Sequence, residues 1–146
     1  MDASYQERNR AATERIKALA HRSDEELSRP IGDGGWTVAV ALAHLAYWDG
    51  RTLGVLELFQ RHGIGRSWWT PAEADAVNDI RLPTWQALRP RAALEAAIRA
   101  AEALDRYVAG LPAGVVAVLS EERPLALDRA RHRGSHLDEI EAALSS

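Results

Sequence analysis

The sequence predicts an all-α protein, an up-and-down four-helix bundle with a short extra helix before the third long helix. Apolar residues recur every three to four positions over four long segments, which is the period of an amphipathic helix. Groups of Pro and Gly separate these segments, and no two strand-like runs are placed to pair with each other. A chain of 146 residues suffices for one domain with a core. We therefore expect a single domain over residues 1–146.

The first long helix is expected over residues 5–21, where Ala12, Ile16 and Leu19 form one stripe among charged residues. The run Ser23-Asp24-Glu25-Glu26 is typical of a capping box, in which the serine and the last glutamate each satisfy a free backbone N–H of the other. It predicts a second, short helical turn.

The second long helix is expected to begin at Thr37, whose hydroxyl can cap it, and to end at His62 before Gly63. Pro30 and the glycines after it interrupt the chain ahead of this helix, and we interpret them as a plain turn. The segment Val38–Trp48 is apolar nearly all round, which is typical of a helix buried on several sides.

The next helix should begin at Thr70-Pro71-Ala72-Glu73, which combines an N-cap, a first-turn proline and a capping-box glutamate. Pro83 and Pro90 predict that this helix is short and is followed by a kinked link. A long helix is then expected from Pro90 to Ala109. The preceding loop carries the adjacent Trp68 and Trp69, which are expected to form a lid, a subunit contact or packing against the end of the bundle.

The segment Val115–Leu119 is rich in β-branched residues but has no evident partner strand, so we expect an irregular link or a turn of helix. The last helix is expected from Pro124 to Leu144.

The most informative feature of the chain is a histidine pair, His132 and His136, on this last helix. Side chains four residues apart lie on one helix face, so the two imidazoles are close enough to share a metal ion. Ile140 and Ala143 continue the stripe, and Leu125 lies on the same side, so the pair is expected to point into the bundle. The other polar residues of this helix are expected to face solvent: Arg129, Arg131, Arg133 and Asp138.

A third histidine, His44, is the only strongly polar side chain in the apolar segment Val38–Trp48. A metal ion, hydrogen bonds to neighbours, or a wetter helix face would each satisfy these inward imidazoles. Facing helices of a bundle are where metal sites are built, and three neutral imidazoles leave a coordination position open. His21 and His62 lie near helix C-termini and are interpreted as capping or surface residues.

Two motifs carry a resemblance to a known family. The run from Gly35-Trp36-Thr37 to His44-Leu45-Ala46-Tyr47-Trp48-Asp49 resembles a segment of the DinB-like superfamily, and the run His132–Ile140 is similar to the H-x-x-x-H-L-x-x-I element of its last helix. These small four-helix proteins include the mycothiol-dependent maleylpyruvate isomerase N-terminal domain and bacillithiol transferases. The order of helices agrees over essentially the whole chain.

The resemblance implies a divalent metal ion (zinc, nickel or iron) held by His44, His132 and His136. It also implies a cofactor-binding role for Asn78, which resembles an asparagine of the thiol-transferase branch. Trp48 lies one turn after His44 on the same face and is a candidate wall of the cofactor pocket, with aromatic core packing as the alternative. Asp138 and Glu139 are either acceptors for the ligating histidines or solvated charges.

The function that the resemblance implies is a metal-dependent enzyme that transfers a low-molecular-weight thiol to an electrophilic small molecule. The absence of cysteine agrees with a thiol that arrives as a cosubstrate. A metal-dependent hydrolase of the same superfamily, or a stress-response protein that is a non-catalytic metal-binding or structural bundle, are the alternatives.

The composition bears on partners and location. The net charge of −3 and pI of about 5.9 disfavour nucleic acid and anionic membranes as partners. The first residues lack the apolar run of a signal peptide, so a cytoplasmic protein is expected. Dimers are common in proteins that this chain resembles, and a homodimer is therefore expected.

Overall fold

The computed structural model describes residues 4–63 and 70–145, and nearly all of these residues are helical. The elements in chain order are α1 (Ser4–Lys17), the 3-10 helix η1 (Ala18–His21), α2 (Asp24–Leu27), β1 (Pro30–Ile31), β2 (Trp36–Thr37), α3 (Val38–His62), α4 (Pro71–Ala87), α5 (Pro90–Ala109), α6 (Ala113–Glu122), α7 (Pro124–Leu127) and α8 (Ala130–Ser145). The prediction of an all-α protein is confirmed.

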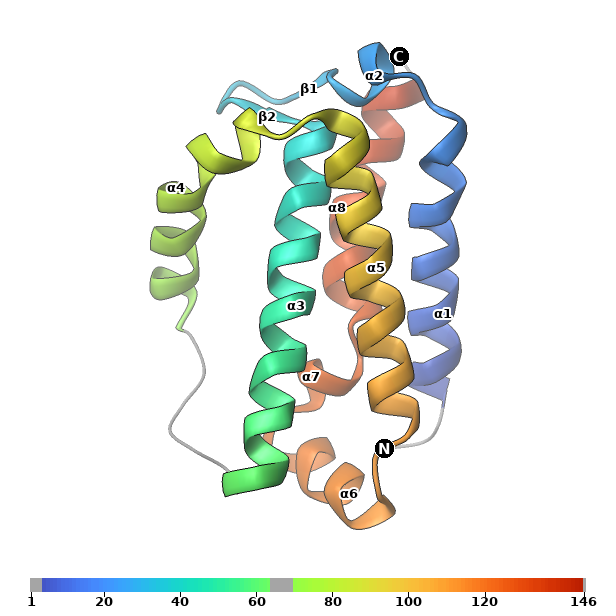
Figure 1. Cartoon of the computed structure of the whole chain (residues 1–146), viewed down its shortest axis with the longest axis vertical. Coiled ribbons are helices and arrows are strands. Elements are labelled where there is room, and N and C mark those ends of the chain that lie inside the picture. Colours follow the sequence, from blue (N-terminus) through green and yellow to red (C-terminus); the bar gives the residue numbers. More distant parts are fainter. Residues whose placement is uncertain (1–3, 64–69, 146) are drawn as a thin grey trace.

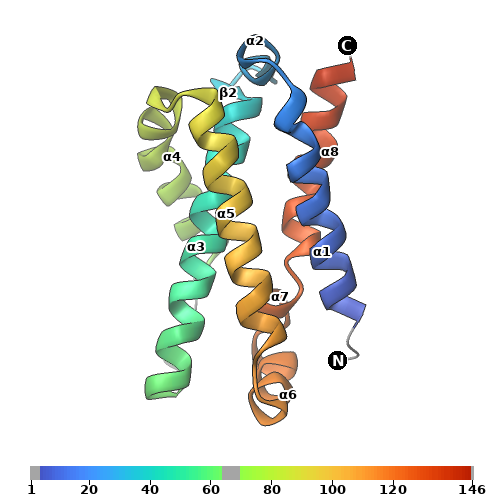
Figure 2. The ribbon, with the colours of Figure 1, turned by 45° about the vertical axis from the view of Figure 1, so that its right-hand side comes forward.

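Of the five helices with 14 or more residues, α1, α3, α5 and α8 pack side by side, and we call these four the long helices (Figures 1 and 2). In Figure 1 the chain passes up α1, down α3, back up α4 and down α5, and finally up α8. The neighbouring helices α3 and α5 therefore run in the same direction. The four long helices run up, down, down and up in chain order. Successive helices alternate in direction only if α4, which runs up between α3 and α5, is included.

Several helix starts and stops lie where the sequence predicts them. Thr37 caps α3 by accepting a hydrogen bond from the backbone N–H of Val40 at 3.1 Å, and the helix ends before Gly63, whose φ of +80° favours glycine. Capping boxes are formed at the N-termini of α2 and α4, by Ser23 and Thr70. These signals act within one turn of the backbone, so the rest of the fold does not override them.

The predicted break at Pro83 is wrong, because α4 continues through this proline to Ala87. Proline cannot donate the backbone hydrogen bond to the carbonyl four residues earlier, here Asp79. Both residues are exposed, so water can reach that carbonyl. The long helix from Pro90 to Ala109 is confirmed.

Two further segments differ from the expectation. The segment Val115–Leu119 lies inside the ten-residue helix α6, which is more helix than the predicted link or single turn. The expected helix from Pro124 to Leu144 is divided into α7 and α8, with a break at Asp128 and Arg129.

The turn after Pro30 is a small antiparallel hairpin in which β1 pairs with β2. Gly35 has a φ of +82°, and its carbonyl accepts a hydrogen bond from the Gln86 side chain at 3.0 Å. The positive φ is what favours glycine here, and a Cβ would also lie 2.9 Å from Nε2 of Gln86, so that this side chain would have to move. The hairpin fixes Trp36 beside the start of α3.

The core consists of two hydrophobic clusters at different levels of the helices. One cluster lies around the first turns of α3 and α5, and the other lies around their last turns, together with Tyr5 and residues of α6 and α7. Between them the helices contribute buried polar side chains: Asn9, Thr13, Asp49, Thr52, Arg129 and Arg133. We call these six residues the polar layer.

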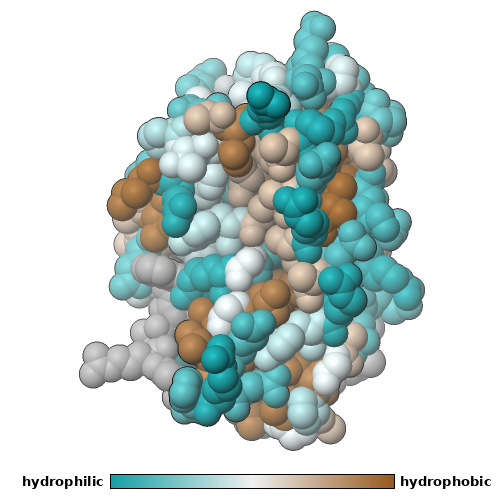
Figure 3. Space-filling view, in the orientation of Figure 1, coloured by the Kyte–Doolittle hydropathy of each residue, from teal (hydrophilic) through white to brown (hydrophobic). Residues whose placement is uncertain are grey.

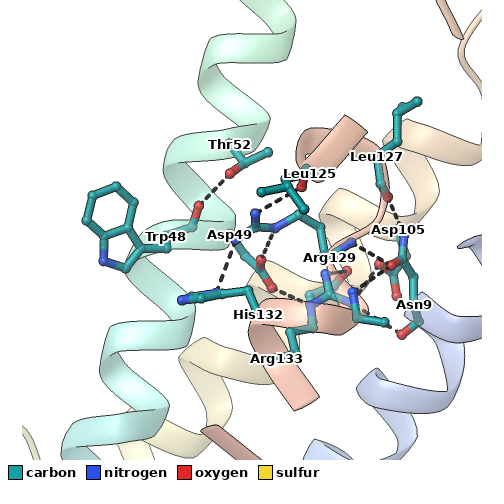
Figure 4. A network of polar contacts seen from close by, with 12 residues as sticks. Asn9, Trp48, Asp49, Thr52, Asp105, Leu125, Leu127, Arg129, His132 and Arg133 are labelled. Atoms are coloured by element: carbon teal, nitrogen blue, oxygen red, sulfur yellow. Dashed lines mark hydrogen bonds and ion pairs between the residues drawn. The ribbon is translucent and has the colours of Figure 1, made fainter. Parts of the chain in front are cut away.

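Arg133 lies at the centre of the polar layer and is fully buried (Figure 4). Its guanidinium donates to Asp49 at 2.7 Å and to Asp105 at 2.9 Å, and its Nη1 also donates to Thr13 at 3.1 Å. Arg129 donates to the other oxygen of Asp49 at 3.0 Å. The expectation that Arg129 and Arg133 face solvent is therefore wrong, whereas Arg131 and Asp138 are exposed as expected. A buried charge needs paired partners, and these come from helices distant in the sequence.

The face shown in Figure 3 is largely hydrophilic, with scattered hydrophobic atoms, including some over α4. Leu125, expected on the inward stripe, is 56% exposed, because the break before α8 separates it from the histidine stripe.

Within the described ranges no single helix is long and apolar enough to cross a membrane. Only α5 and α6 taken together have the length and the apolar composition of a membrane span, and these two helices meet at an angle of 115°.

Replacement of Arg133 by methionine tests the polar layer. The substitution leaves Asp49 and Asp105 without their central cation, and we expect it to lower the free energy of unfolding by about 3–5 kcal/mol. The measurement is urea unfolding followed by circular dichroism. Arg131→Met, on the exposed side of the same helix, is the control and should change stability by less than about 0.5 kcal/mol. Equal effects of the two substitutions would contradict the structural role given to Arg133.

Candidate metal centre

Three histidines from two helices converge on one point. His44 comes from α3, and His132 and His136 come from α8. One ring nitrogen of each lies within 4.8 Å of the others, and the Nε2 atoms of His44 and His132 are 3.1 Å apart. Two nitrogens bound to one tetrahedral zinc ion lie about 3.3 Å apart, so small movements of the rings would complete a site. This cluster could hold a metal ion.

The local structure explains why these side chains meet. The spacing of four residues in α8 places His132 and His136 one turn apart, with ring centroids separated by 5.0 Å. His44 lies in the buried first half of α3, and its ring centroid is 4.4 Å from that of His136. The three histidines that the sequence analysis names as candidate ligands therefore lie together in the structure.

The environment keeps all three imidazoles uncharged. Burial lowers the pKa of His44 to about 3, with a further contribution from the neighbouring His136, while the nearby Asn78 side chain acts in the opposite direction. Burial and then the positive charge of Arg129 lower the pKa of His132 to about 2. Burial also lowers the pKa of His136, although Glu139 opposes this shift. Neutral imidazole is the form that binds metals, so these residues are ready to act as ligands at neutral pH.

The hydrogen bonds around the cluster describe its metal-free state. The Nε2 atoms of His44 and His132 face each other, and Nδ1 of His44 is buried without a hydrogen-bond partner. Arg129 lies 3.3 Å from Nδ1 of His132, which therefore acts as an acceptor and leaves the ring's proton on Nε2, directed at His44 (Figure 4). A metal ion at Nε2 would require this proton to leave Nε2 and the contact with Arg129 to open. The oxygen of Glu139 lies 3.4 Å from Nδ1 of His136, where it can orient that ring.

Indole rings enclose the cluster on the side of α3. Trp36 stacks parallel to His136, with ring centroids 6.2 Å apart and an interplanar angle of 11°, and it meets the edge of His44 at 5.1 Å. Trp85 meets His44 edge-on at 5.5 Å. Trp85 is buried and excludes water from its side of the cluster, whereas Trp36 is half-buried and also contributes to the wall of the neighbouring pocket.

The other side opens into a pocket of about 850 Å³ that is bounded by α3, α4, α7 and α8. All three histidines contribute to its wall, and so do Trp48 and Asn78. The indole N–H of Trp48 donates to the side-chain oxygen of Asn78 at 2.8 Å. The predicted cofactor residues therefore lie beside the histidines, and their cofactor-binding role stays a prediction.

The remaining candidates lie away from the cluster. His21 and His62 are exposed, as expected of surface residues, and Asp138 forms an ion pair with Arg15 at 2.9 Å. Tyr47 packs against Trp85, with ring centroids 5.9 Å apart, and does not line the pocket. Trp68 and Trp69 lie outside the described residues.

Sequence reasoning missed Trp36 and Trp85 as neighbours of the histidines, and it missed the contact of Arg129 with His132. A signal for the arginines was present. Asp49 follows Leu42 and Leu45 at helical spacing, on the face that the apolar segment buries, and a buried carboxylate requires a cation. The sequence does not say which cation.

No protein-family model matches this chain, and neither a curated protein nor a solved structure matches it significantly. The resemblance to the DinB-like superfamily therefore stays a prediction that rests on the two motifs.

Removal of single histidines tests the metal site. We expect about one equivalent of divalent metal in the purified parent, because three neutral imidazoles are sufficient for a stable site. His44→Ala and His136→Ala should each lose most of it. The measurement is elemental analysis of tag-free protein, with circular dichroism to confirm that the variants fold. His62→Ala, in the exposed last turn of α3, should keep the metal. Full retention in His44→Ala would exclude a site shared between α3 and α8.

The role of Glu139 is tested separately. Glu139→Gln removes the charge beside Nδ1 of His136 and should weaken metal affinity by about tenfold, since partners of ligating histidines have effects of this size. The measurement is competition with a chromogenic chelator. Glu95→Gln, on the exposed side of α5, serves as the control. An unchanged affinity in Glu139→Gln would show that this carboxylate is only a solvated charge.

Proposed function

We propose that this protein is a metal-dependent enzyme that transfers a low-molecular-weight thiol to an electrophilic small molecule, as the resemblance to the DinB-like superfamily implies. The observation that carries the proposal is the convergence of three uncharged imidazoles at the wall of an open pocket of about 850 Å³. A purely structural histidine cluster needs no such access. A non-catalytic metal-binding protein would not need it either.

A divalent ion held by neutral imidazoles keeps its double positive charge and lowers the pKa of a thiol or water molecule that binds to it. The chain would supply three ligands to the ion, His44, His132 and His136. The pocket beside them would admit the thiol or the water molecule. Because the chain contains no cysteine, a sulfur nucleophile must come from a cosubstrate.

The residues of the pocket have separate tasks in this proposal. The rings of Trp36 and Trp85 pack against the imidazoles, and the buried Trp85 keeps water from their inner side. Asn78 fixes the indole of Trp48 through their hydrogen bond, so that this ring forms a rigid wall for the substrates. The thiol proton leaves to solvent through the open pocket. The sulfur forms its bond to the electrophilic carbon while the bond from that carbon to a leaving group breaks, and the leaving group departs with the electron pair into the pocket.

Cobalt substitution tests this proposal directly. Addition of 2-mercaptoethanol to the Co²⁺-loaded protein should produce a thiolate-to-cobalt charge-transfer band, because the open position admits sulfur. The band should be absent in His136→Ala, which lacks a ligand, and present in His62→Ala.

Turnover with an electrophile distinguishes the two enzymatic alternatives. Consumption of an electrophile such as 1-chloro-2,4-dinitrobenzene only in the presence of the thiol supports the transferase. The hydrolase would instead be supported if the protein hydrolyses ester or lactone substrates in a metal-dependent way without a thiol and shows no charge-transfer band. A six-coordinate cobalt spectrum that neither thiol nor substrate changes would indicate a non-catalytic metal-binding protein.

A further inference from the structure

The three histidines of the cluster differ in which ring nitrogen carries the proton. His132 accepts from Arg129 at Nδ1, so its own proton lies on Nε2 and is donated to Nε2 of His44, 3.1 Å away. His44 accepts at Nε2 and therefore carries its proton on Nδ1. The carboxylate of Glu139 lies 3.4 Å from Nδ1 of His136, and an acceptor at this distance favours a proton on that nitrogen as well.

Two of the three rings thus carry their protons where a metal site needs them, and one does not. A neutral imidazole binds a metal ion through the nitrogen without a proton, while its other nitrogen keeps the N–H. Nε2 is the nitrogen without a proton in His44 and His136. In His132 this nitrogen is Nδ1, and the guanidinium of Arg129 already occupies the position beside it.

Either way of binding His132 to a metal ion excludes its contact with Arg129. A metal ion at Nδ1 would take the place of Nη2 of Arg129, which lies 3.3 Å from this nitrogen. A metal ion at Nε2 would require the ring proton on Nδ1, where it would face an N–H of the guanidinium. An N–H cannot accept a hydrogen bond, and two cations would then lie on either side of one imidazole.

Two further hydrogen bonds hold Arg129 in this position (Figure 4). Its Nε donates to Asp49 at 3.0 Å and its Nη1 donates to the carbonyl of Leu125 at 3.1 Å, so each nitrogen of the guanidinium has an acceptor. Arg129 and His132 both contribute to the wall of the pocket of about 850 Å³. The pocket therefore gives Nη2 room to turn towards water while Nε stays with Asp49.

We propose that Arg129 and the metal ion exclude each other at His132, so that Arg129 is a positioning residue that weakens metal binding. Arg129 must release Nδ1 before His132 can become the third ligand. The ring proton then moves from Nε2 to Nδ1 by exchange with water in the pocket, without a net gain or loss of protons. This inference deepens the proposed function, on which it rests, by naming the side chain that controls whether the site is filled.

The first test reads the ring protons of the parent protein and so needs no variant of Arg129. Long-range proton–nitrogen correlation spectra of isotope-labelled, chelator-treated protein distinguish the two tautomers of each histidine, and single histidine substitutions assign the signals. We expect the Nε2–H form for His132 and the Nδ1–H form for His44 and His136. Addition of about one equivalent of Zn²⁺ should convert His132 to the Nδ1–H form.

Two results of these spectra would overturn the proposal. One is the Nδ1–H form of His132 in the metal-free protein, because Nδ1 could then not accept from Arg129. The other is a His132 that binds zinc through Nε2 and carries no proton on Nδ1, because its contact with Arg129 could then persist.

The second test measures zinc affinity by competition with a chromogenic chelator. Arg129→Met removes the competing contact and should bind Zn²⁺ about tenfold more tightly than the parent, which must give up a charge-assisted hydrogen bond on binding. Circular dichroism checks that this variant folds, with Asp49 still paired to Arg133. Arg131→Met is the matched control. It removes an equal charge from an exposed side chain next to His132 and should change the affinity by less than about twofold. An affinity that is unchanged or weaker in folded Arg129→Met, or an equal gain in both variants, would refute the role of Arg129.

The inference and the proposed function fail separately. A parent that binds zinc no less tightly than Arg129→Met would keep the proposed enzyme and lose the role of Arg129. Uptake of zinc by Arg129→Met but not by the parent would support the role of Arg129 and remove the metal-dependent reaction from the parent protein. Absence of uptake in both proteins would overturn both.

Discussion

The fold depends on one buried guanidinium, that of Arg133 on α8. Its exposed fraction is 0%, and it is hydrogen-bonded to Asp49 on α3, to Asp105 on α5 and to Thr13 on α1. A single side chain therefore ties its own helix to the three other long helices. Hydrophobic contacts allow helices to slide past one another with a modest change in energy, whereas a buried ion pair tolerates little displacement. We infer that the polar layer fixes the register of the helices, while the hydrophobic clusters above and below it supply most of the stability.

The histidine cluster is built on the same interaction. His132 adjoins Arg133 in sequence, and Asp49 lies five residues after His44, so the register that joins Asp49 to Arg133 also brings the two imidazoles together. Arg129 contacts both Asp49 and His132 and couples the polar layer to the site directly. A site whose ligands come from separate helices is precise only if the helices are held in register, and here the ion pairs hold them. The pocket can therefore stay open on one side without loss of geometry.

The buried face of α8 shows why the sequence predicted only part of the tertiary structure. The pattern predicts that His132, His136 and Ile140 point into the bundle and that the arginines point away. In the structure the buried stripe is Arg133, Leu137, Ile140 and Leu144, and the histidines lie on its flank, towards the pocket. Periodicity gives the angles between side chains around a helix axis, but it does not say which angle faces a neighbour. The bias against burying arginine, correct for most arginines, led to the wrong choice of face.

The sequence by itself determined the long helices in outline, several of their ends and the choice of the three histidines, because caps, helical periodicity and a spacing of four residues act within a turn or two of the backbone. Only the tertiary structure decided that α4 passes through Pro83, that the chain breaks before α8, and that α3 and α5 run in the same direction. It also decided the burial of Arg129 and Arg133 and the contacts of Trp36 and Trp85 with the histidines. These features depend on partners tens of residues away: a charge is stable in the core only where distant acids meet it, and a proline is tolerated only where water reaches the carbonyl that it leaves free.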